Sequence, residues 1–237
     1  MKKKLEQLAM VAFVVGTLSF GGGCAFGDRQ VSLRPVYAYK IAQATTKQKV
    51  QVTLPEDGRN IKQTNTFVGY VRNGYGMHTA SVFSKKTIND WVQECIVKNL
   101  KNAGFNVTKE KKTTKGLYIS TLMQVLECDA QMQYNARVIL KTKLKKDDFT
   151  LFEQTFSGNF KQTNWAASSS GYQQCLTKAM KQCVDRMIPA LARELEKYQP
   201  SITQTAIAST AKTPKTVSKV TTITAKPKSN QLPDFLK

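Results

Sequence analysis

The residues YNARVILKTKLKKDDFTLFEQTFSGNF, positions 134–160, carry the pattern from which the architecture can be predicted. In the first half, apolar side chains alternate with Arg and Lys. In the second half, Phe152, Phe156 and Phe160 alternate with polar residues. Because successive side chains of a strand point to opposite faces, each half is predicted to be a strand with one packed and one wet face. The polar turn 145–148 joins them as a hairpin.

Two amphipathic helices are predicted around these strands. Apolar residues at 88–100 recur at spacings of three and four, between a capping-box start at Thr87 and a stop at Gly104. A second apolar stripe at helical spacing covers residues 172–195, after a serine cap at 168–170. One face of each helix should therefore pack against the sheet.

The remaining apolar runs complete the predicted fold. Residues 66–71 and 117–126 read as strands, and the first of them ends at the turn signal Asn73-Gly74. The order is then strand, helix, three strands, helix. We predict an α+β fold with a mostly antiparallel sheet of about four to five strands and both helices on one face.

Composition divides the chain into four segments. Residues 1–23 are predicted as a signal peptide, and residues 24–64 as an N-terminal tether with short strands. Residues 65–198 form the predicted α+β domain. Residues 199–237 are rich in Thr, Ser, Ala, Lys and Pro without periodicity, which predicts a disordered basic tail because such a composition cannot bury enough surface to fold.

The first 23 residues have the pattern of a secretory signal peptide. A positive start at Lys2–Lys4 precedes an almost wholly apolar run at 8–20, and glycines follow at 21–23. A helix needs about 20 apolar residues to cross the hydrocarbon core of a membrane. Because this run is shorter, we predict that the segment is removed rather than kept as an anchor.

The segment Leu18–Cys24 resembles the lipobox of bacterial lipoproteins, where a cysteine is acylated with fatty acids such as palmitate and the chain is cut before it. Gly21 departs from the pattern, which usually has leucine there. The resemblance implies a lipid anchor on Cys24, and Ala25 after it implies forwarding to the outer membrane, with the domain at the periplasmic face. The alternative is an ordinary signal peptidase site and a soluble periplasmic protein.

Four further cysteines form an even set in a compartment where disulfides persist: Cys95, Cys128, Cys175 and Cys183. Cys175 and Cys183 share one predicted helix, about 12 Å apart at ~1.5 Å per residue, which exceeds the reach of a disulfide. If two bridges form, each of these two must pair with Cys95 or Cys128. The alternative is four buried free thiols. No metal site is predicted, because no ligand spacing occurs.

The charge balance favours anionic partners. The chain has 36 Lys and Arg against 16 Asp and Glu, a net charge of +20. Without the first 23 residues the counts are 33 and 15, or +18, of which the tail from Tyr198 onward contributes +5. Nucleic acid would be the first candidate for a cytosolic protein of this charge. Because export argues against nucleic acid, anionic glycolipid or cell-wall polymer is the expected anionic partner.

The loop at residues 72–78 is the candidate partner-binding site. It combines a guanidinium, an amide, an aromatic ring, a thioether and the one histidine of the chain, at Arg72, Asn73, Tyr75, Met77 and His78. Loops on a rigid scaffold are common contact sites. The alternative is an ordinary glycine-rich connection. No catalytic signature or cofactor motif occurs, so neither enzymatic activity nor a cofactor is predicted.

The chain resembles the YajG-type uncharacterised lipoproteins of Gram-negative bacteria in three segments: residues 89–107, the strands at 117–160 and the helix at 172–195. The resemblance rests on hydrophobic order and on the segment Asn-Ala-Gly-Phe-Asn-Val at 102–107. It implies an envelope location and a fold, but no function. The basic tail and the four cysteines depart from the family pattern.

The sequence leaves three hypotheses for the function. The first is an outer-membrane lipoprotein that acts as a non-enzymatic accessory or scaffold subunit of an envelope complex for transport, secretion or surface assembly, with an envelope protein as partner. The second is a binding module for anionic envelope glycolipid or cell-wall polymer. The third is a hydrolase using His78, which the apolar setting predicted for every cysteine disfavours.

Overall fold

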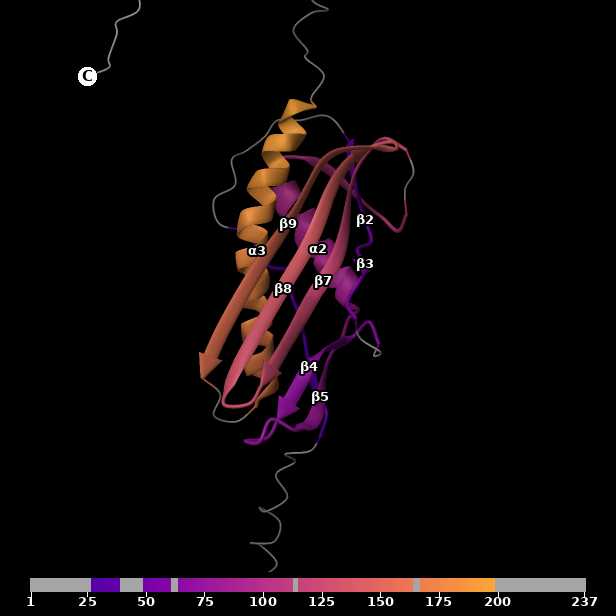
Figure 1. The fold of residues 1–237 in the computed structure, drawn as a ribbon. Coiled ribbons are helices and arrows are strands. Elements are labelled where there is room, and N and C mark those ends of the chain that lie inside the picture. Colours follow the sequence, from indigo (N-terminus) through magenta and orange to yellow (C-terminus); the bar gives the residue numbers. More distant parts are fainter. Residues whose placement is uncertain (1–26, 39–48, 61–63, 113–114, 164–166, 199–237) are drawn as a thin grey trace, which may run out of the picture. The chain divides into compact units, whose positions relative to one another are not determined.

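The computed structural model describes residues 27–38, 49–60, 64–112, 115–163 and 167–198 (Figure 1). These residues form a mixed sheet of nine strands with two helices. The prediction of a mostly antiparallel sheet of four to five strands in the order strand, helix, three strands, helix is therefore wrong. Within the described residues, five strands precede the first helix and four lie between the two helices.

Three long antiparallel strands form a meander, β7 (Leu117–Ala130), β8 (Gln133–Lys146) and β9 (Phe149–Thr163). The predicted hairpin of β8 and β9 is present, with Leu140 opposite Phe156. The apolar residues of β8 except Ile139 are buried, and its Arg and Lys residues are partly or fully exposed. Asp147 in the β8–β9 turn has a φ of 54°, and its carboxylate accepts a hydrogen bond of 2.7 Å from the amide of Gly116.

Six short strands lie on the other side of β7: β1 (Arg29–Val31), β2 (Lys49–Thr53), β3 (Glu56–Asp57), β4 (Phe67–Arg72), β5 (His78–Ser84) and β6 (Asn106–Glu110). β2, β3 and β4 pair with β7 in parallel, one after another along its length, at Tyr118, Leu122 and Ala130. β6 pairs with β2, and β5 joins β4 to β1. The sheet is larger than predicted because these strands use the free edge of β7.

The stretch predicted as an N-terminal tether supplies three of these strands, β1, β2 and β3. Val31, Val50 and Val52 have at most 1% of their surface exposed. They pack in the same apolar cluster as the helices. The described part of this stretch therefore contributes to the core of the domain.

Two helices, α2 (Ile88–Asn102) and α3 (Ser169–Lys197), cover the same face of the meander (Figure 1). Both predicted caps are present. The Thr87 hydroxyl accepts a hydrogen bond of 3.3 Å from the amide of Asp90, and the Ser168 hydroxyl accepts one of 3.2 Å from the amide of Gly171. Such caps satisfy amide groups that have no partner inside the helix.

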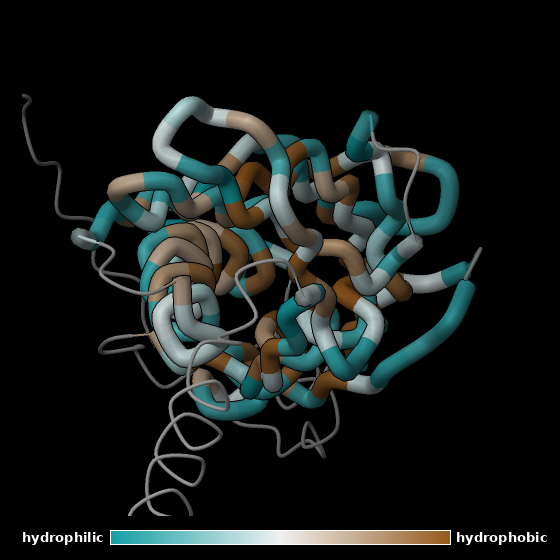
Figure 2. The backbone as a smooth tube through the Cα atoms, turned by 90° about the horizontal axis from the view of Figure 1, so that it is seen from below, coloured by the Kyte–Doolittle hydropathy of each residue, from teal (hydrophilic) through white to brown (hydrophobic). Residues whose placement is uncertain are grey.

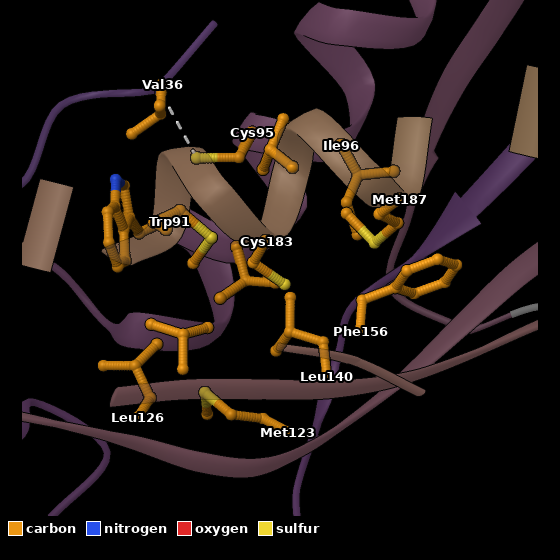
Figure 3. Packing of buried hydrophobic residues seen from close by; sticks show 14 of the residues in the cluster. Val36, Trp91, Cys95, Ile96, Met123, Leu126, Leu140, Phe156, Cys183 and Met187 are labelled. Carbon is orange, nitrogen blue, oxygen red and sulfur yellow. Dashed lines mark hydrogen bonds between the residues drawn. The ribbon is translucent and has the colours of Figure 1, made fainter. Parts of the chain in front are cut away.

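The core lies between the two helices and the sheet. Figure 3 shows Trp91, Cys95 and Ile96 of α2 close to Cys183 and Met187 of α3. Met123, Leu126, Leu140 and Phe156 complete the cluster from the strands below. Figure 2 shows hydrophobic segments inside and hydrophilic ones at the margin. Burial of these side chains, at about 25 cal/mol per Å² of apolar surface, provides the main stabilisation.

Helix α2 also buries polar side chains that lie outside its apolar stripe. The Gln93 side chain donates hydrogen bonds of 2.8 and 2.9 Å to the carbonyls of Val52 and Glu110, at the ends of β2 and β6. The Asn99 amide donates to the carbonyl of Val36 at 2.7 Å, and its oxygen accepts from the amide of Ala38. Polar positions of this helix therefore hold the N-terminal segment in place.

Several predictions concern residues outside the described ranges. These are the signal peptide at 1–23, the acylated Cys24 and the basic tail at 199–237. In the described ranges, no helix combines the length and the apolar character needed to cross a membrane.

Candidate functional site

The predicted loop is a tight turn between β4 and β5, not a connection to a helix. The amide of Asn73 donates to the carbonyl of Met77 at 3.0 Å. The Asn73 side-chain oxygen accepts hydrogen bonds of 3.0 Å from the amides of both Tyr75 and Met77. Gly76 has a φ of 84°, a conformation that glycine adopts without steric cost. The Asn73 side chain thus acts as the internal support of the turn.

Arg72 ties this turn to β7. Its guanidinium donates two hydrogen bonds, of 2.8 and 2.6 Å, to one carboxylate oxygen of Asp129 and a third of 3.2 Å to the carbonyl of Gly76. The second carboxylate oxygen of Asp129 accepts a hydrogen bond of 3.1 Å from the amide of Tyr70. Because charge-assisted hydrogen bonds are the stronger class, this ion pair fixes the relative positions of β4 and β7.

A second turn, between β7 and β8, lies beside the first. The Gln131 side chain donates a hydrogen bond of 2.9 Å to the carbonyl of Gly74 and so joins the two turns. A pocket of about 480 Å³ lies here, lined by Arg72, Asp129 and residues 131–133 and 135. We call the combined face of the two turns the two-turn surface. Its members are Arg72, Tyr75, Met77, Asp129, Gln131 and Met132.

Three large apolar side chains of the two-turn surface are exposed to solvent. Tyr75 is 91% exposed, Met132 72% and Met77 60%. Two of them come from the β4–β5 turn and one from the β7–β8 turn. Aromatic residues, Met and Arg are enriched at protein–protein interfaces, and here they stand on turns held by hydrogen bonds. The combination of exposed aromatic and thioether side chains with hydrogen-bonded turns is typical of protein-binding surfaces.

His78 is placed for packing rather than for acid–base chemistry. Its ring stacks on the ring of Tyr70, with centroids 3.9 Å apart and an angle of 8° between the planes. The Arg72 guanidinium lies 5.7 Å from the centroid of the same Tyr70 ring. All four described cysteines are buried, whereas His78 is exposed. In the part of the chain that the structure describes, no Cys–His pair is therefore assembled.

The four described cysteines lie on the two helices and β7. Burial raises the pKa of both Cys95 and Cys183 to about 12. The Cys128 thiol lies beside that of Cys175, and this contact, followed by burial, raises the pKa of Cys128. The same contact lowers the pKa of Cys175. All four cysteines are buried, and Cys128 and Cys175 are neighbours. The disulfide pairing and its free-thiol alternative both stay predictions.

The structure brings together all five predicted loop residues but gives them different roles. Tyr75 and Met77 point outward, Asn73 supports the turn, and Arg72 and His78 make internal contacts. Asp129, Gln131 and Met132 were not predicted. No local pattern marks Asp129 and Gln131, because their hydrogen bonds to the loop join positions 57 residues apart in the sequence.

Comparisons with known proteins add a fold likeness. No protein-family model and no curated protein matches the sequence. A Xanthomonas campestris protein of the DUF330 family has a similar structure, with a TM-score of 0.52 and 12% identity over 72% of this chain and 97% of that chain. At this identity the likeness shows a shared fold alone.

Two more distant structures were also found. A neuraminyllactose-binding hemagglutinin homolog from Helicobacter pylori has a TM-score of 0.38 and 14% identity, covering 70% of this chain and 92% of that chain. Lipoprotein GNA1162 from Neisseria meningitidis has a TM-score of 0.27 and 8% identity, covering 63% and 99%. Likeness at this level carries no inference about function.

Proposed function

We propose that this chain is an envelope lipoprotein, anchored in the outer membrane through Cys24, whose domain faces the periplasm and serves as a non-enzymatic accessory subunit of an envelope complex. Membership of the YajG-type family is part of this proposal. The positive and apolar start and the lipobox-like segment ending at Cys24 support the anchor. The two-turn surface supports a protein partner.

The observation that carries the proposed partner binding is the exposure of Tyr75, Met77 and Met132 on two turns that a hydrogen bond joins. Few residues dominate the binding energy of most interfaces, and they are enriched in Tyr and Arg near the centre of the contact. The turns are already held by the Arg72–Asp129 ion pair and by the Gln131 bond to Gly74. Such preorganisation lowers the entropic cost of association.

Photo-crosslinking in the native envelope tests the proposed surface. A photoreactive residue is placed at Tyr75 or Met132. The matched control is placed at Phe149, the first residue of β9, which is 76% exposed and follows the β8–β9 turn at the other end of the meander. Figure 1 shows this end of the meander. We expect a discrete crosslinked protein from the first two positions and none from the third. Equal crosslinking at all three positions would contradict the assignment of the surface.

The anchor is tested separately. Mass spectrometry of the mature N-terminus should find acylated Cys24, and Cys24→Ser should release the chain from membranes. A native product that still begins at Met1 and stays in the cytosol would refute the envelope location. Tyr75→Ala should keep the anchor and lose the crosslinked partner.

A further inference from the structure

A second pocket lies at the opposite end of the meander from the two-turn surface. Its volume is about 350 Å³. It forms where the parallel strands β2 and β6 end side by side, at Thr53 and Glu110. The first residues of β7 and the last residues of β8 provide the rest of the wall, with Tyr118 opposite Lys145. The pocket thus belongs to the sheet scaffold.

Three lysines line this pocket, Lys111, Lys112 and Lys145, against one acidic residue, Glu56. Their formal charge is therefore +2. Within the described residues none of the three lysines forms an ion pair. Lys141 and Lys143, further along β8, instead share the carboxylate of Glu153 at 2.5 and 2.9 Å. The positive charge in the pocket is thus not neutralised by the protein.

The rest of the lining combines a hydroxyl group with apolar surface. Ser120 brings a hydroxyl from β7, and Leu54 and the Tyr118 ring bring apolar atoms. The Lys145 ammonium lies 6.0 Å from the centroid of that ring, which leaves it near the pocket rather than extended into solvent. The Thr53 hydroxyl is already used, since it donates to the carbonyl of Ile119 at 3.2 Å. The lysines and the hydroxyl groups of Ser120 and Tyr118 are therefore the lining groups that can donate to a ligand.

We propose that this pocket binds a phosphate group carried by a sugar or a lipid headgroup. A phosphate monoester carries between one and two negative charges near neutral pH and has three strong acceptor oxygens, which matches three ammonium groups and a hydroxyl. The apolar wall would contact the organic part of the ligand. This site is separate from the two-turn surface, so it goes beyond the proposed partner binding.

The test uses the full mature chain with Cys24→Ser, so that no lipid anchor inserts into vesicles. Glycerol 3-phosphate is titrated while backbone amide shifts are followed by NMR. In a parallel arm, vesicles of phosphatidylcholine with and without phosphatidic acid, whose headgroup is a phosphate monoester, are sedimented with the protein. The pocket variant is K111A/K112A/K145A. The charge-matched control is K85A/K98A/K161A, whose lysines are exposed and lie outside the pocket.

We expect saturable binding with shifts at Lys111, Lys112 and Ser120. The pocket variant should bind at least about tenfold more weakly and the control within about twofold, because charge-assisted hydrogen bonds depend on position. Binding in the glycerol 3-phosphate arm indicates a soluble phosphorylated ligand, and binding only to vesicles that contain phosphatidic acid indicates a lipid headgroup. Equal weakening of both variants, or no saturable binding in either arm, would overturn the proposal. Tyr75→Ala should leave this binding unchanged.

Discussion

Replacing Gly158 of β9 by alanine should separate helix α3 from the sheet. A Cβ atom at this position would lie 1.9 Å from the carbonyl oxygen of Ala179 and 2.8 Å from the amide nitrogen of Cys183. Both are backbone atoms of α3, so no side chain can rotate away. Since ordinary contacts need about 3.5 Å, the helix must move by roughly 1.5 Å.

Such a shift weakens the packing of α3 against β8 and β9. Overpacking of a core costs about 1–3 kcal/mol, and occasionally more. Because the obstructing atoms belong to the backbone, we expect the free energy of unfolding to fall by about 3 kcal/mol. In a domain of this size, 1 kcal/mol corresponds to about 2–4 °C, so Tm should fall by about 6–12 °C. Urea unfolding followed by tryptophan fluorescence, to which the fully buried Trp91 contributes, measures the free energy of unfolding.

Gly74→Ala is the matched control. A Cβ atom at Gly74 would have no heavy atom within 4 Å, so the free energy of unfolding should change by less than about 0.5 kcal/mol. If Gly158→Ala is as stable as Gly74→Ala, then α3 is not seated directly on β9, and the close packing of this helix against the strand is refuted.

Further predictions concern buried polar and ionisable groups. The side chain of Arg59 is 4% exposed; it donates to the carbonyls of Phe67 and Leu126 and pairs with Asp57. Arg59→Ala should lower the free energy of unfolding in urea by about 3–5 kcal/mol. A loss below about 1 kcal/mol would contradict this role. The Arg59 hydrogen bond lowers the pKa of Asp57 below its ordinary value of 3.8. The stability it provides is present above that value and is lost as the pH falls through the lower folded pKa, so Asp57→Asn should flatten the acid limb of a stability–pH profile. Burial raises the pKa of Cys95 from 9.0 to about 12, so stability should fall as the pH rises from 9 toward 12, and Cys95→Ala should reduce this slope. At neutral pH the native thiol should resist iodoacetamide, and rapid labelling without unfolding would contradict its burial.

The sequence predicted the elements whose pattern is local. The β8–β9 hairpin follows from alternation within residues 134–160, and α2 and α3 follow from apolar stripes and from caps at Thr87 and Ser168. Each of these signals depends on residues no more than a few positions apart. These elements can therefore be predicted without knowledge of contacts between distant parts of the chain.

The candidate site was predicted only in part for a related reason. Residues 72–78 attract attention because they combine a turn signal with interface residues. Whether they bind a partner depends on what holds the turn. Asn73 supports the turn from within, and Asp129 and Gln131 support it from outside, where the parallel pairing of β4 and β7 brings them.

Side chains close in sequence were enough to predict the long strands, both helices, their caps and the charge of this chain. The use of β7 as a shared centre for β2, β3, β4 and β8 could come only from folding in three dimensions. Parallel pairing joins backbone groups that every residue carries, across long separations in the chain. These backbone hydrogen bonds leave no pattern in the amino-acid sequence. The pairing of β4 with β7 that they form brings Arg72 to Asp129.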